Sequence, residues 1–273
     1  MNRITHTIET ARRNQHKLLS IFITAGYPHL ELTVPLVLEA AKNGADMIEI
    51  GIPFSDPLAD GPTIQQSSQV ALEQGITLTQ IFDLVSDIRR QSPVPLILMG
   101  YINPILQFGY KEFLAKAAEI GVDGLIVPDL PPEEAGELKS LCQQFSLSNI
   151  FLISPNTPSE RIRYIGELST DFVYCVSVTG VTGARKGINP NLLKFLRHVR
   201  DLITKPFLVG FGIATPEDAQ NISRHCDGVI VGSAFIDLIR NNANKSELEL
   251  LTSVAKYIRN LKSSISGVTD GYY

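Results

Sequence analysis

Residues 46–62 read DMIEIGIPFSDPLADGP and combine one buried strand with the loop that follows it. Side chains of a strand alternate between its two faces, so the three isoleucines share one face and Glu49 lies on the other. A carboxylate flanked by buried positions costs several kcal/mol unless it is neutralised or partnered. A second acid, Asp60, follows in the loop, which three prolines stiffen. This pair of acids indicates an acid/base active site.

Apolar runs of this kind recur along the chain, separated by stretches with helical periodicity. Continuous apolar runs are typical of parallel strands that are buried on both faces. The predicted strands are Leu19–Thr24, Met47–Ile52, Leu96–Tyr101, Gly124–Val127, Ile150–Ser154, Phe172–Ser177, Phe207–Phe211 and Val229–Gly232.

Helices are predicted between these strands where an N-cap, an early proline or an early acid marks a start. They include Leu30–Asn43, Glu133–Phe145, Asn191–Leu202, Glu247–Lys262 and two helices that open at Pro158 and Thr215. An extra helix over Thr7–Arg13 precedes the first strand.

Eight β–α units in 273 residues predict an α/β fold, a (β/α)₈ TIM barrel formed as one domain over residues 1–273. A doubly wound open sheet is the alternative, and the absence of a dinucleotide fingerprint makes it less favoured. Residues 264–273 are expected to form a frayed tail.

Composition excludes several classes of function. No apolar run approaches the roughly 20 residues of a membrane span, and the first residues do not resemble a signal peptide. The net charge of −4, without a basic run, argues against a nucleic-acid partner. Three isolated cysteines fit a reducing cytoplasm. The five histidines fall outside the predicted strands, which argues against a metal site or a Ser/His triad.

Glycine-rich turns follow the last three predicted strands, at residues 179–183, 210–213 and 232–234. Barrels often bind phosphate on the loops after strands seven and eight, against the N-terminus of a short helix. Ser233–Arg240 is predicted to be that helix, with Ser233 as its N-cap. The alternative is that these segments are ordinary tight turns.

Four aromatic residues lie on or next to predicted strands, and they would line an apolar pocket if they point inward near the top of the barrel. The alternative is that each is an ordinary core residue. The four are Phe22, Tyr101, Tyr174 and Phe211.

The segment from Glu49 to Pro62 resembles the signature of the tryptophan synthase α subunit family. Further matches occur in family order at residues 21–28, 128–131, 177–184, 210–213 and 231–234. The resemblance spans nearly the whole chain. It implies a lyase that cleaves indole-3-glycerol phosphate to indole and glyceraldehyde 3-phosphate, in tryptophan biosynthesis, without a cofactor of its own.

The resemblance also assigns roles to residues. It places the family's general acid/base on Glu49, whose pKa burial should raise towards neutrality, and the aspartate that polarises the indole N–H on Asp60. Thr182 falls on a lid where a threonine helps to position that aspartate, and Val178 departs from the arginine of some bacterial members. Phosphate contacts fall on Gly183, Gly212, Gly232 and Ser233, and the indole pocket falls on Phe22, Tyr174 and Phe211.

A partner follows from the same resemblance: a β subunit that holds pyridoxal phosphate and receives indole, in an α₂β₂ complex. The implied contacts are Asp56, Pro57, Asn103, Asp129 and Pro131. Whether the chain acts with such a subunit or alone stays open.

Two other interpretations stay open as well. One is another phosphate-binding barrel, such as a sugar-phosphate isomerase or an indole-glycerol-phosphate synthase, although the lysine that such synthases carry on a strand is absent from the predicted strands. The other is a catalytically silent barrel that only activates or scaffolds a partner.

Overall fold

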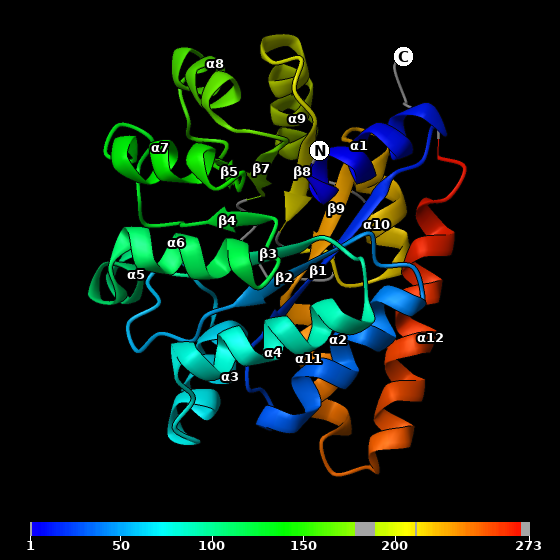
Figure 1. Cartoon of the computed structure of the whole chain (residues 1–273). Helices are drawn as coiled ribbons and strands as arrows, with labels where there is room; N and C mark the ends of the chain where they lie inside the picture. The colour runs from blue at the N-terminus through cyan, green and yellow to red at the C-terminus, as the bar shows by residue number, and fades with distance from the viewer. Residues whose placement is uncertain (1, 178–188, 211, 269–273) are drawn as a thin grey trace.

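The computed structural model describes residues 2–177, 189–210 and 212–268. Parallel strands form a barrel that helices surround (Figure 1). The strands are β1 Leu18–Thr24, β2 Met47–Gly51, β3 Leu96–Met99, β4 Gly124–Ile126, β5 Ser148–Ile150, β6 Leu152–Ile153, β7 Val173–Val176, β8 Phe207–Gly210 and β9 Gly228–Val231.

Barrel closure runs through the predicted fifth strand. The hydrogen-bonded order is β5-β4-β3-β2-β1-β9-β8-β7-β6, so β5 and β6 stand at its two ends. These two strands are separated in sequence only by Phe151, whose carbonyl oxygen accepts a hydrogen bond from the Tyr174 amide at 3.0 Å. One extended segment therefore bonds β4 with its first half and β7 with its second half. The predicted barrel is confirmed, whereas the prediction of one unbroken strand over Ile150–Ser154 is wrong.

The helices follow the strands around the barrel. They are α1 Arg3–Arg13, α2 Thr33–Lys42, α3 Pro62–Glu73, α4 Leu78–Gln91, α5 Ile102–Phe108, α6 Tyr110–Glu119, α7 Gly136–Gln144, α8 Ser159–Leu168, α9 Pro190–Leu202, α10 Pro216–Ser223, α11 Ser233–Asn242 and α12 Glu247–Ile265, with a short 3₁₀ helix at Leu30–Leu32. Helix α7 begins later than the predicted Glu133, because the chain first makes a tight turn in which the Glu134 amide bonds the Pro131 carbonyl at 3.0 Å.

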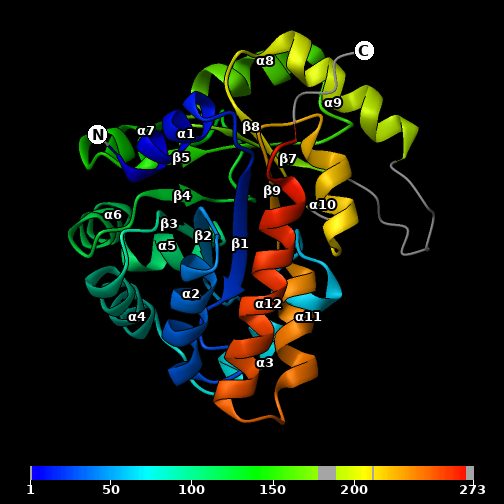
Figure 2. The same cartoon turned by 90° about the vertical axis from the view of Figure 1, so that its right-hand side faces the viewer.

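The C-terminal helix is longer than predicted. Figure 2 shows α12 running beside α2 and α11, which it contacts. The helix extends to Ile265, which is fully buried, and Val268 beyond it is buried too. The expected tail from residue 264 therefore starts too early, since apolar contacts hold the chain to at least Val268. That the chain is one domain stays a prediction.

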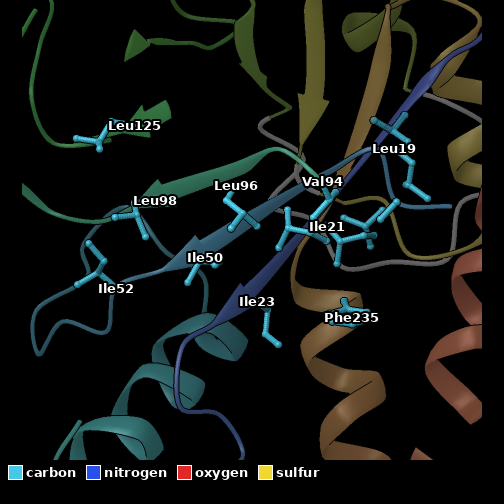
Figure 3. Packing of buried hydrophobic residues seen from close by; sticks show 14 of the residues in the cluster. Leu19, Ile21, Ile23, Ile50, Ile52, Val94, Leu96, Leu98, Leu125 and Phe235 are labelled. Carbon is cyan, nitrogen blue, oxygen red and sulfur yellow. The ribbon is translucent and has the colours of Figure 1, made fainter. Parts of the chain in front are cut away.

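Two apolar layers result from the alternation of side chains along the strands. The outward-facing side chains pack against the helices in one buried cluster. Figure 3 shows Ile21, Ile50 and Leu96 of this cluster together with Phe235 of α11. The inward-facing side chains, such as Phe22 and Met47, fill the barrel lumen together with residues of α1. The position of Glu49, two residues after Met47, places its side chain in this lumen.

Helix α1 lies at the end of the barrel where the strands begin, opposite α3 (Figure 2). Its start is tied to Asp123, which precedes β4 and is 3% exposed. Oδ1 of Asp123 pairs with Arg3 Nη1 at 3.0 Å, and Oδ2 pairs with Arg89 Nη2 at 2.7 Å. Oδ2 also accepts the Leu96 amide at 2.9 Å. This buried carboxylate is thus fully partnered. None of the described helices is long and apolar enough to cross a membrane.

Candidate active site

Glu49 projects into the lumen from the middle of β2. Its register partners are Phe22 on β1 and Ile97 on β3, both of which face inward. The side chain is 0% exposed. Ser20 Oγ donates a hydrogen bond to Oε1 at 2.7 Å, and Oε2 has no hydrogen-bond partner among the described residues.

The electrostatics of Glu49 follow from this burial. Loss of hydration raises its pKa from 4.5 to about 7, although the Ser20 hydrogen bond lowers it. The predicted shift towards neutrality is thus confirmed. At neutral pH both the acid and the carboxylate are populated, which is the property required of a group that both donates and accepts a proton.

Asp60 lies in the loop between β2 and α3. The Tyr101 hydroxyl donates to Oδ2 of Asp60 at 3.0 Å and accepts the Ala59 amide at 2.9 Å. Burial raises the Asp60 pKa, and the Tyr101 hydrogen bond lowers it. The Tyr101 ring stacks on Phe54, with 5.2 Å between ring centroids. Tyr101, expected only as a pocket aromatic, therefore also anchors the second acid.

Tyr174 on β7 connects the two acids. Its side chain is 4% exposed, and its pKa is raised well above 10 by burial and then by the charges of Glu49 and Asp60. The ring and hydroxyl lie against Gly210 on β8, where a Cβ atom would overlap them. The charges of both carboxyl groups thus act on the same tyrosine hydroxyl.

The candidate phosphate turn follows β9, which pairs with β1. Gly232 occupies the N-cap of α11, and Ser233 is the first helical residue. The expected N-cap role of Ser233 is therefore wrong, because helical backbone geometry already begins there. The first amide groups of a helix have no partner within it, and they carry the positive end of its dipole. Gly212, after β8, has φ +75°, a conformation that favours glycine.

Phe22 connects the acid strand with the phosphate turn. A Cβ atom on Gly51, two residues after Glu49, would overlap the Phe22 ring. A Cβ atom on Gly232 would lie 3.6 Å from Phe22 Cβ. Gly51 thus leaves room for the Phe22 ring, and Phe22 has the Glu49 strand on one side and the α11 turn on the other.

The remaining predicted residues divide into two groups. Val178, Thr182, Gly183 and Phe211 lie outside the described residues. Of the implied partner contacts, Asp56, Asn103 and Asp129 are exposed, Pro131 is partly buried and Pro57 is buried.

Two features of the site escaped prediction from sequence. Leu58, beside Pro57, is 93% exposed and is the large apolar side chain on this loop that meets solvent. Ser20 follows the same alternation as Phe22 on β1, and that pattern was the signal for its inward position.

In the described parts of the chain, no cluster of three or more potential metal ligands occurs. Cys142, Cys175 and Cys226 are buried and unpaired with one another, and burial raises the pKa of each thiol.

Comparison with known proteins gives a consistent result. The model of the tryptophan synthase alpha chain family matches residues 8–266. The tryptophan synthase alpha chain of Geotalea daltonii is 46% identical over 266 residues, which cover 97% of this chain and all of that protein. The alpha subunit structure from Legionella pneumophila has a TM-score of 0.90 at 39% identity, with 97% of this chain and 98% of that chain covered.

A structure of the tryptophan synthase complex from Pyrococcus furiosus is similar as well. Its TM-score is 0.82 at 36% identity, and the match covers 91% of this chain and 99% of that chain.

Proposed function

The chain belongs to the tryptophan synthase alpha chain family, and we propose that Glu49 and Asp60 carry out the family's reaction in this protein. The reaction is the retro-aldol cleavage of indole-3-glycerol phosphate to indole and glyceraldehyde 3-phosphate, a lyase step of tryptophan biosynthesis. The observation that carries the assignment of residues is the Glu49 carboxyl, buried in the lumen with a pKa near 7 and held by a hydroxyl alone among the described residues.

Glu49 moves the proton that the cleavage requires. The bond between indole C3 and the glycerol chain breaks after C3 gains a proton, and the hydroxyl that becomes the aldehyde loses one. Glu49 in its acid form protonates C3, and the resulting carboxylate takes the hydroxyl proton. The bonding pair returns to the ring, and Glu49 regains its acid form. A pKa near the working pH suits both transfers.

Asp60 acts on the nitrogen of the ring. Protonation of C3 makes the indole nitrogen part of a positively charged indolenine. A carboxylate that accepts the N–H hydrogen bond stabilises this charge as it develops. The Tyr101 hydroxyl holds the Asp60 carboxylate in place, so little rearrangement accompanies the reaction.

The phosphate group binds at the opposite side of Phe22. The α11 N-terminus with Gly232 and Ser233, together with Gly212, offers backbone amides to a dianion. Anchoring the phosphate orients the reacting carbon towards Glu49. Thr182, Gly183 and Phe211 belong to the same proposal through family resemblance, as do Phe22 and Tyr174 as walls of the indole pocket.

We further propose a tryptophan synthase β subunit as partner, in an α₂β₂ complex. The similarity to the Pyrococcus furiosus complex supports such a partner. The contact surface is the rim that carries Asp56, Pro57, Asn103, Asp129 and Pro131. The pyridoxal phosphate belongs to the β subunit, and the alpha chain's own reaction uses no cofactor. A cytoplasmic location fits this pathway.

An indole-release assay tests the roles of the acids. With indole-3-glycerol phosphate, we expect Asp60→Asn to lower kcat by about 10²-fold, because transition-state charge is left unstabilised. Asp87→Asn, on the exposed side of α4, is the matched control and keeps wild-type turnover. Equal turnover of the two variants would remove Asp60 from the mechanism.

A glycine pair tests the phosphate site. Gly212 and Gly267 have the same φ of +75°, so aspartate strains both backbones alike. Gly267 follows α12, and Val268 next to it lines a cleft with Leu18 at the start of β1. We expect Gly212→Asp to abolish binding of glycerol phosphate through repulsion, while Gly267→Asp retains it. Similar affinities of both variants would contradict the site.

The alternative of an indole-glycerol-phosphate synthase is less favoured, because such synthases carry a lysine on a strand and none of the described strands carries one.

A further inference from the structure

Ser20 is the side chain that controls the orientation of the Glu49 carboxyl group. It lies on β1, is 0% exposed, and pairs in register with Met47. Phe22 pairs with Glu49 itself, so Ser20 stands one inward position nearer the end of the barrel where the strands begin. From there its hydroxyl donates to Oε1 of Glu49 at 2.7 Å.

The two oxygens of Glu49 are thereby made different. Oε1 is fixed by a short hydrogen bond, whereas Oε2 has no partner among the described residues and is buried. No salt bridge reaches Glu49 within those residues. The Glu49 charge acts on the ionisable hydroxyl of Tyr174 on β7, which supplies no positive charge.

We propose that Ser20 is a positioning residue that holds Oε1 of Glu49 and leaves Oε2 to carry out both proton transfers. This inference rests on the proposed role of Glu49. A serine hydroxyl suits the task because it can donate to Oε1 both in the carboxylate and in the acid, where Oε2 carries the proton and Oε1 is a carbonyl oxygen. It therefore keeps the same grip on Glu49 before and after the proton leaves.

The proton balance is complete on one oxygen. Oε2–H gives its proton to indole C3 as the new C–H bond forms. The substrate hydroxyl then gives its proton to Oε2 as the carbonyl forms and the C–C bond breaks. Without the Ser20 bond, rotation of the carboxyl group would exchange the two oxygens, and the ionised form would lose its one hydrogen-bond donor among the described residues.

The test compares pH profiles of kcat/KM for the full chain with indole-3-glycerol phosphate. Ser20→Ala removes a hydrogen bond to a charged group, so the limb of the profile that reports Glu49 should move upward by about one pH unit or more. At neutral pH kcat should fall about 10-fold with little change in KM, since substrate contacts remain. Ser20→Thr, which restores the hydroxyl, should return the limb towards its wild-type position.

Ser223→Ala is the matched control. Ser223 is equally buried, and its hydroxyl bonds the Gln220 carbonyl at 3.0 Å within α10. Loss of a buried serine hydroxyl in general would affect stability in both variants, but only the Ser20 variant should shift the pH profile. If Ser20→Ala does not fold, as judged by circular dichroism, Ser20→Cys provides a weak donor of similar size and should shift the limb in the same direction.

An unmoved limb in a folded Ser20 variant overturns the inference, as does a shift that Ser20→Thr fails to reverse. The Glu49→Gln variant shows whether such a result overturns only the role of Ser20 or also the proposed role of Glu49. If Glu49→Gln is inactive while the Ser20 limb is unmoved, only the positioning role is lost. If Glu49→Gln turns over normally, the assignment of the acid itself is lost.

Discussion

Two buried carboxylates of this barrel, Asp123 and Glu49, have opposite electrostatic surroundings. Asp123, at the end where the strands begin, is paired with two arginines and a backbone amide. Glu49, within the lumen, has one hydroxyl and no described cation. The fold thus compensates the first charge with opposite charge and leaves the second to be neutralised by a proton. The first arrangement stabilises the fold, and the second provides reactivity.

The largest effect should come from removing the reactive carboxylate. We expect Glu49→Gln to lower kcat by roughly 10²–10⁴, the usual contribution of general acid/base catalysis, with KM little changed. Steady-state indole formation measures it. Asp123→Asn should keep the wild-type kcat per folded molecule, and a comparable loss of turnover there would erase the distinction between the two carboxylates.

Removing the paired carboxylate, Asp123, should instead lower the unfolding free energy of the protein. Asp123→Asn leaves the Arg89 guanidinium, 12% exposed, without its counter-charge. Breaking a buried pair in this way costs about 3 kcal/mol or more of unfolding free energy. Urea denaturation followed by circular dichroism measures the loss. A loss below about 1 kcal/mol would mean that Asp123 is not the structural charge that its contacts indicate.

The pH dependence of stability should distinguish the two sites next. The Glu49 pKa is raised from 4.5 to about 7 on folding, so the folded state binds more protons than the unfolded state between these values. The contribution of Glu49 to the unfolding free energy is therefore largest below pH 4.5, and it is lost as the pH rises through about 7. The total fall is about 3 kcal/mol. Unfolding free energies of the wild type and of Glu49→Gln are measured at pH 5 and pH 8, and the variant should lack this fall. If the difference between the two pH values is the same in both proteins, the Glu49 pKa is not raised.

The smallest effect should come from the outer arginine of Asp123. Arg3 is 45% exposed, so solvent screens its ion pair. We expect Arg3→Gln to lower the unfolding free energy by less than about 1 kcal/mol. A loss as large as that of Asp123→Asn would show that the charge compensation depends on α1 rather than on Arg89.

Much of the fold can be predicted from sequence because strand alternation and helix starts are local signals. The alternation along residues 47–51 correctly directs Glu49 away from the isoleucine face. The break at Phe151 is not a local signal, since it arises where one segment changes its hydrogen-bonding neighbour from β4 to β7. The burial of Ile265 likewise depends on where α12 packs.

The site was predicted less completely, for the same reason. The bond between Ser20 and Glu49 depends on how β1 and β2 align, and a strand pattern alone does not fix that register. The role of Tyr101 depends on how the loop with Asp60 folds back over β3. Asp123 joins groups from α1 and α4 that are distant along the chain.

A last consequence concerns the space that Phe22 fills between Gly51 and Gly232. One ring sets the separation of the strand that carries the proposed acid from the turn proposed to hold phosphate. A side chain at Gly51 would overlap that ring, whereas a Cβ atom at Gly232 would only touch Phe22 Cβ at 3.6 Å. The space in which this ring lies beside the proposed acid thus depends on what position 51 lacks, namely a side chain.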